Sequence, residues 1–191
     1  MSGTASEGAL ITGKTVKLKD ANGNSAVDTI TDATTGNYSI DVSNFTAPFL
    51  VTVTGSQGTH ISLAQAAGKA NINPITTAVV ALAAGNSDVS AIFTNLTPMQ
   101  LTAIKTKYAN KAALLTTSLQ AALPVGVKVD DYFTGTITVG EGMDVVFDTY
   151  QFTIDPATGI KVKTKDASAI SVLTIPAATV TANTDQPLPN N

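Results

Sequence analysis

Alternating apolar and polar positions dominate the first 58 residues of the chain. A period of two is typical of strands with one buried face, and the Gly, Asn and Asp residues between the alternating runs are typical of turns. The pattern predicts strands at residues 8–19, 26–31, 37–43 and 49–54. A polar break at residues 56–59 should separate this antiparallel β structure from the rest of the chain.

Helical signals follow the break. Asn73 and Pro74 form an N-cap with proline in the first turn, and Gly85 supplies the usual C-terminal glycine. The helix between them is apolar on nearly every side, so it should be buried. Two more helices are predicted, a short one from Ser87 to Phe93 and the longest from Thr97 to about Leu123.

Strand patterns return after Val125. They predict strands at residues 134–139, 151–154, 160–165 and 169–175, and either a short helix or a strand at 143–150, where the helix is preferred. The Pro- and Asn-rich residues 184–191 should form a flexible tail. The sequence therefore predicts an α+β protein with a β domain at 1–58 and a helical plus β domain at 59–183, in which the helices pack on the C-terminal strands.

Composition narrows the class of partner. An apolar content of 43% indicates a folded chain, and a net charge of −3 with eleven lysines and no arginine argues against binding to nucleic acid. The absence of cysteine excludes disulfides and thiolate chemistry. Residues 1–4 do not look like a signal peptide, and no window is apolar enough to cross a membrane.

The polar turn Thr31–Tyr38 carries a family resemblance. Together with the Asn22–Gly23 turn before it and the strand Pro48–Gly55 after it, this turn resembles the carboxypeptidase-regulatory-like domain of bacterial surface proteins. The segment Ala66–Thr77 is similar to the linker and helix that follow such a domain in uncharacterised bacterial lipoproteins and secreted proteins.

The resemblance implies an N-terminal transthyretin-type, Ig-like antiparallel β-sandwich, followed by a helical segment and a C-terminal antiparallel β region. It also implies an extracellular or cell-envelope location, with a signal or lipid anchor removed from this chain. The expected function is structural, adhesive or assembly-related and non-enzymatic. A carbohydrate- or calcium-binding module of the cell envelope is the alternative.

Calcium is the cofactor that the sequence suggests, if it has one. Asp20, Asn22 and Asn24 alternate like the opening of a calcium loop, and Asp28 falls at the ninth position. Ser25 stands in place of the loop glycine, however, and the bidentate glutamate is missing. A hairpin with an Asn-Gly turn explains the same residues.

Acidic and aromatic residues near the C-terminal strands form the second candidate site. Paired carboxylates could serve glycoside hydrolysis, and exposed aromatic rings could support a sugar; a solvated acidic rim explains the same carboxylates. The acidic residues are Asp130, Asp131, Glu141, Asp144 and Asp148, and the aromatic pairs are Tyr132–Phe133 and Tyr150–Phe152. The ligand candidates among them are Tyr132, Asp144, Asp148 and Tyr150.

His60 is the only histidine, so a catalytic triad would need it. Its position after the last predicted N-terminal strand suggests a surface or hinge residue, and we expect no enzymatic activity. Residues 1–6 look like the remnant of a shortened first strand, which would leave a neighbouring edge able to accept a strand from a protein partner or a second copy. Alternatively, Lys14, Lys17 and Lys19 protect that edge.

Overall fold

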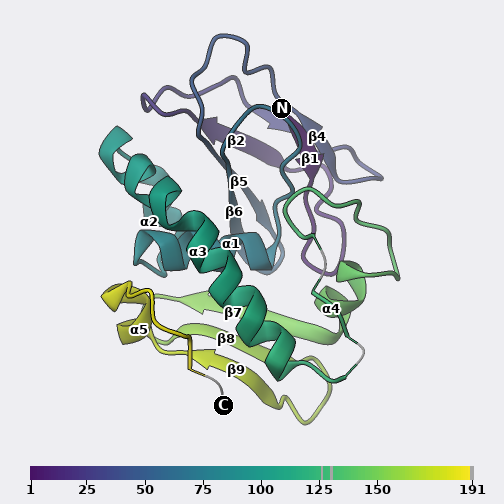
Figure 1. Ribbon diagram of the computed structural model, residues 1–191. Helices are drawn as coiled ribbons and strands as arrows, with labels where there is room; N and C mark the ends of the chain where they lie inside the picture. Colours follow the sequence, from purple (N-terminus) through teal and green to yellow (C-terminus); the bar gives the residue numbers. More distant parts are fainter. Residues whose placement is uncertain (126, 130, 190–191) are drawn as a thin grey trace.

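The computed structural model describes residues 1–125, 127–129 and 131–189. It contains helices and antiparallel sheets, which confirms the α+β class. N-terminal strands lie at one end of the molecule, a three-stranded C-terminal sheet lies at the other, and the helices of residues 74–122 lie between them (Figure 1). No helix in the described ranges combines the length and apolarity needed to cross a bilayer.

The N-terminal part contains two sheets. Four strands pair antiparallel in the order β3-β2-β5-β6, and β1 pairs antiparallel with β4. The bounds are β1 Ser2–Thr4, β2 Thr15–Lys19, β3 Thr29–Ile30, β4 Asn37–Ser39, β5 Phe49–Gly55 and β6 Gly58–Ala64. The strand predicted at 8–19 begins only at residue 15, because Gly8 and Gly13 have positive φ angles that a strand does not allow.

The break predicted at residues 56–59 is a hairpin turn. β6 follows at once and pairs with β5 from Gly55 and Gly58 to Phe49 and Ala64. The prediction that helical structure begins after residue 59 is therefore wrong, and the expected domain boundary falls inside one hairpin.

β1 does not leave an open edge beside it. On one side it pairs with β4, and on the other its backbone bonds the segment 68–72, through Ser2 N to the Gly68 carbonyl at 2.9 Å and Ile72 N to the Thr4 carbonyl at 3.0 Å. The expectation that a shortened first strand leaves its neighbour unpaired is wrong, because residues 2–6 already occupy that position.

The three predicted helices are confirmed as α1 Pro74–Ala84, α2 Val89–Thr94 and α3 Pro98–Ala122. Asn73 caps α1 by accepting hydrogen bonds from the amides of Ile75 and Thr76, and Gly85 ends the helix with φ 66°. α2 is capped by Asp88 rather than by Ser87. These boundaries follow from local cap residues, which is why the sequence predicts them well.

The C-terminal part forms the antiparallel sheet β7-β8-β9 with two short helices. The bounds are α4 Met143–Thr149, β7 Tyr150–Asp155, β8 Gly159–Thr164, β9 Ser171–Ile175 and α5 Ala177–Ala182. Residues 134–139, where a strand was predicted, contain no strand.

Three of residues 184–189 contact the rest of the fold. Lys111 of α3, itself buried, donates from Nζ to the Thr184 carbonyl and lies 3.1 Å from Asp185 Oδ1. Leu188 is buried in the core. The flexibility predicted for residues 184–191 stays a prediction, and these contacts are made by three of its described residues.

Two apolar cores fill the molecule. The smaller lies between the β1–β4 pair and one face of the four-stranded sheet, and includes Tyr38, Val16 and Val51. The larger surrounds α1 and joins Leu50 and Leu63 of β5 and β6 to the helices and the C-terminal sheet. Our expectation that the helices pack on the C-terminal strands rather than on the N-terminal sheet is wrong, because α1 packs on both.

We predict that residues 60–183 do not fold when expressed alone. The fragment lacks β5, which pairs with β6 along its length, and it exposes the apolar face that Leu50 completes. We expect a molten state with poor dispersion of NMR signals and binding of a hydrophobic dye, whereas the full chain under the same conditions gives dispersed signals. A dispersed fragment spectrum with a cooperative thermal transition would contradict the shared core.

Candidate functional site

The Glu7 carboxylate lies against the turn between β5 and β6. It accepts hydrogen bonds from the backbone amides of Ser56 at 2.7 Å and Gln57 at 3.0 Å, and from the Ser56 hydroxyl. Gln57 Nε2 donates in return to the Glu7 carbonyl at 2.6 Å. A Cβ atom on Gly55 would lie 2.5 Å from Glu7 Oε2, so this close approach requires glycine there. Glu7 therefore fixes residues 5–8 to the hairpin.

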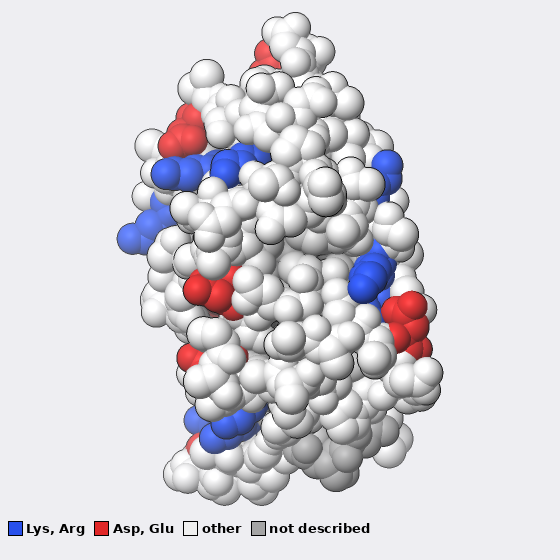
Figure 2. Space-filling model, turned by 90° about the vertical axis from the view of Figure 1, so that its left-hand side faces the viewer, with Lys and Arg blue, Asp and Glu red and all other residues white. Residues whose placement is uncertain are grey.

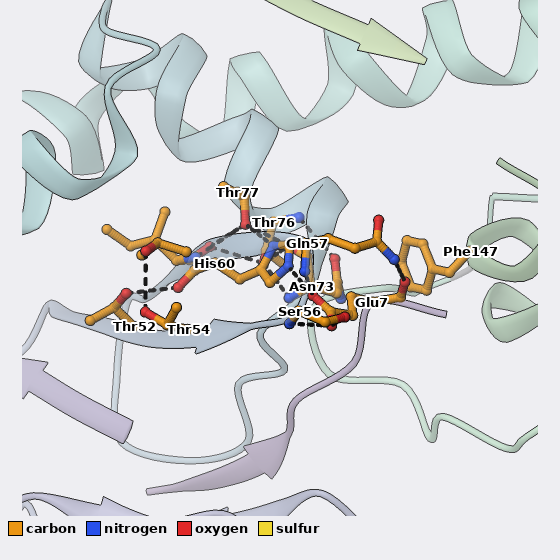
Figure 3. Close-up of polar contacts among 12 residues, drawn as sticks. Glu7, Thr52, Thr54, Ser56, Gln57, His60, Asn73, Thr76, Thr77 and Phe147 are labelled. Atoms are coloured by element: carbon orange, nitrogen blue, oxygen red, sulfur yellow. Dashed lines mark hydrogen bonds and ion pairs between the residues drawn. The ribbon is translucent and has the colours of Figure 1, made fainter. Parts of the chain in front are cut away.

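His60 belongs to β6 and lies beside Glu7. Both side chains are buried, with 5% of each residue exposed. Its Nε2 is 2.9 Å from Glu7 Oε2, and its Nδ1 is 3.4 Å from the Thr77 hydroxyl of α1 (Figure 3). The expectation of a surface or hinge histidine is wrong. β6 is a regular strand, and its alternation turns His60 inward, toward the layer that contains Glu7.

The protonation of Glu7 follows from this environment. Burial raises the pKa of the Glu7 carboxyl, but hydrogen bonds from His60, Ser56 and Gln57 outweigh burial and lower the pKa to about 2. Glu7 is thus a carboxylate at neutral pH, and three residues of one hairpin stabilise its charge.

The start of α1 covers the outer edge of β6. The Thr76 hydroxyl donates to the Ile61 carbonyl at 3.0 Å, and the Ile61 amide donates to the Thr77 hydroxyl at 3.1 Å. An edge strand leaves such backbone groups without partners unless something covers them. The helix therefore ends this sheet in place of another strand and positions Thr77 beside His60.

A cleft of about 240 Å³ opens next to His60. It lies where the hairpin turn, the start of α1, the loop before α2 and the strand β7 meet. Its walls combine apolar and polar side chains, which is typical of small-ligand sites. The lining residues are Gln57, Gly58, Thr59, His60, Pro74, Thr77, Ser87, Asp88, Val89, Ser90, Phe152, Ile154 and Pro156.

The Glu7–His60 pair fixes the β5–β6 turn in place and is not arranged for nucleophilic chemistry. A carboxylate that orients a histidine is part of a catalytic triad, but the third member must be a free hydroxyl. Thr77 is buried, and its hydroxyl donates to the Asn73 carbonyl at 2.7 Å within its own helix. In the described ranges, no three His, Asp or Glu side chains gather closely enough to hold a metal ion.

The calcium candidates form a turn around Asp20. Its Oδ1 accepts hydrogen bonds from the amides of Asn22 at 2.9 Å and Asn24 at 2.8 Å, and its Oδ2 accepts from the Thr46 amide at 3.1 Å. Burial raises the pKa of Asp20, but these amides outweigh it and lower the pKa below its usual value. Asp28 is exposed. The Asp20 carboxylate thus organises the hairpin, as the alternative interpretation of these residues expects.

The second set of candidates does not form one site. Tyr132 and Tyr150 are buried, so neither presents a ring face to a sugar. Asp144 is fully buried and accepts a hydrogen bond from the Gly140 amide at 2.7 Å, whereas Asp148 on the same helix is exposed. A solvated rim is therefore wrong for Asp144.

The other acidic candidates also remain separate. Asp131 is exposed and caps its own turn by accepting hydrogen bonds from the amides of Phe133 and Thr134, and Glu141 is exposed. Asp130 lies outside the described residues.

Sequence reasoning missed Glu7 altogether. Its signal is weak, a lone carboxylate among small and apolar residues between Thr4 and Ile11. The alternation of Ile61 and Leu63 with His60 and Ser62, after the turn at Gly58, could have revealed β6, but it places His60 on the face opposite Ile61 and so does not signal its burial. The pairing of Glu7 with His60 has no local signal, because 53 positions separate them.

The charged surface is sparse and mixed. On the face shown in Figure 2, a few lysines and acidic residues lie among many uncharged side chains, and several lie next to a residue of opposite charge. This face presents no continuous basic patch of the kind that binds a polyanion.

Comparisons with known proteins give no match: none was found to a family model, to a curated protein or to a solved structure.

We predict that Glu7→Gln destabilises the protein by about 1 to 3 kcal/mol, because buried His60 and the two amides of the turn lose a charged acceptor. Urea unfolding at neutral pH measures the loss. Glu141→Gln, at an exposed position, is the matched control and should change stability by less than about 0.5 kcal/mol. Equal stability of the two variants would show that the Glu7 contacts add nothing.

The contribution of Glu7 should also depend on pH. Since folding lowers the pKa of Glu7 from 4.5 to about 2, its stabilisation is fully present above about pH 4.5 and is lost as the pH falls toward about 2. The difference in unfolding free energy between the natural chain and Glu7→Gln should therefore shrink across this window. A difference that stays constant down to the lower end would place the Glu7 pKa at its ordinary value.

Proposed function

We propose that this chain is a non-enzymatic, exported bacterial surface protein with a structural, adhesive or assembly role. The proposal extends the resemblance of Thr31–Tyr38 and the flanking strands to the carboxypeptidase-regulatory-like domain. The two N-terminal sheets with an apolar core between them are compatible with the transthyretin-type sandwich that this resemblance implies.

One observation carries the non-enzymatic part of the proposal. Three of the groups that could do acid-base chemistry are engaged in fixing loops and strand ends. Glu7 binds the β5–β6 turn, Asp20 binds its own hairpin, and the His60 Nε2 lies against Glu7. Since a general acid or base must reach a substrate proton, side chains used in this way fit a structural role better than a catalytic one.

The alternative of a carbohydrate-binding module has one specific support, the cleft beside His60, which places Pro156 and several polar side chains around one small volume. The calcium alternative has less support, because both Asp20 oxygens accept backbone amides. The adhesive role and the carbohydrate-binding alternative are compatible, because a surface protein can adhere by binding sugar.

Surface location is the part of the proposal that is tested first. The native gene, tagged internally at an exposed turn such as the one at residues 156–158, is expressed in its bacterial host, and intact cells are treated with protease. We expect the tag to be removed from intact cells, while a cytoplasmic marker stays whole. Protection of the tag until the envelope is broken would overturn the proposed location.

A further inference from the structure

We propose that the cleft beside His60 binds one ring of a neutral saccharide. This inference rests on the adhesive form of the proposed function and names its ligand class. Four segments distant in sequence meet at this cleft: the β5–β6 turn, the start of α1, the loop before α2 and β7. Apart from the Glu7 contacts and the α1 cap, the fold leaves several polar groups there available.

The free polar groups include both donors and acceptors. Asp88 Oδ1 accepts the amide of Ala91, which leaves Oδ2 for a ligand. Gln57 uses its Nε2 on the Glu7 carbonyl, which leaves its carbonyl oxygen. Ser87 is 6% exposed, and its hydroxyl has no partner among the residues that the structure describes.

The apolar part of the lining suits a sugar ring. Pro156 and Ile154 supply the accessible carbon surface of the lining, since Phe152 is 7% exposed and Pro74 is buried. Like the lining of the cleft, a pyranose has an apolar part and a polar part. The apolar part is a face of C–H groups, and the polar part is a rim of hydroxyls that both donate and accept hydrogen bonds. No lysine lines the cleft, and Asp88 does, so an anionic ligand is disfavoured.

The volume of the cleft limits the ligand to one sugar ring. The volume of about 240 Å³ is below the roughly 300 to 1,000 Å³ of pockets that enclose drug-sized molecules. A ligand this small binds with a roughly millimolar Kd, and an adhesive surface protein would need many copies for firm attachment. The larger hollow of about 650 Å³ beside β1 and β4 fits a sugar less well, since its Tyr38 is buried and its Lys69 already bonds the Gly135 carbonyl.

Titration of the full chain by NMR tests the inference. The probes are the methyl glycosides of glucose, galactose, mannose and N-acetylglucosamine, and cyclohexanol is the control ligand with a ring but no array of hydroxyls. We expect at least one glycoside to give saturable shifts at the amides of residues 57–60 and 87–90. Cyclohexanol should bind at least about tenfold more weakly, because it leaves the polar groups of the cleft unpaired.

Two variants complete the test. Ser90→Trp fills the cleft from an exposed position on α2 and should weaken binding at least about tenfold, whereas Thr117→Trp, exposed on α3, should not. Asp88→Asn keeps the helix cap but removes the charge, and should weaken binding several-fold. Each variant is first shown to keep the thermal unfolding midpoint of the natural chain.

Three results would overturn the inference: no glycoside shifts the cleft amides, cyclohexanol binds as tightly as the best glycoside, or Ser90→Trp binds like the natural chain. None of them bears on surface location, which the protease experiment decides separately. A surface-exposed chain that ignores all four glycosides would keep the proposed function and lose only its ligand.

Discussion

The burial of α1 is the constraint on which the rest of this structure depends. Ten of its eleven residues are buried, and the helix has no polar face to turn toward solvent. Such a helix is stable only if apolar surface covers it on every side. The β5–β6 hairpin, α3 and the C-terminal sheet supply that surface together, so each of them needs the others to stay folded around the same helix.

A helix buried this completely also buries polar groups at its ends, and these must find partners. At the start of α1 the Asn73 side chain bonds two helix amides and, through Nδ2, the Tyr132 carbonyl at 2.8 Å. Thr76 and Thr77 bond the edge of β6. Polar side chains near α1 therefore connect segments that apolar packing alone would leave free to slide.

Local patterns predicted the elements that local chemistry determines. Asn73, Pro74 and Gly85 mark α1 because a helix end is satisfied by neighbours in sequence, and Thr97 marks the start of α3 in the same way. Residues 134–139 alternate like a strand but pair with no strand in the part of the chain that the structure describes. A strand needs such a partner, which sequence alternation cannot provide.

Long-range pairing explains the other differences. Glu7 and His60 come together only because β1 lies beside residues 68–72 and brings the following segment against the hairpin turn. The burial of Lys111 depends likewise on Thr184 and Asp185, more than seventy positions away. A single sequence contains the partners of such contacts but does not indicate which of them meet. The calcium and acidic candidates, whose residues are close in sequence, were therefore easier to propose than the Glu7–His60 pair.

The contacts of Lys111 have a mechanical consequence. Tension on the chain from beyond residue 184 would reach Thr184 and Asp185 before it reached α5 and β9, and Lys111 would pass part of the load to the 25-residue helix α3. The force would then be shared by the residues of the core, and the hydrogen bonds between β8 and β9 would not break one after another. When the protein is pulled from its C-terminal end, the contacts of Lys111 in α3 would resist extension.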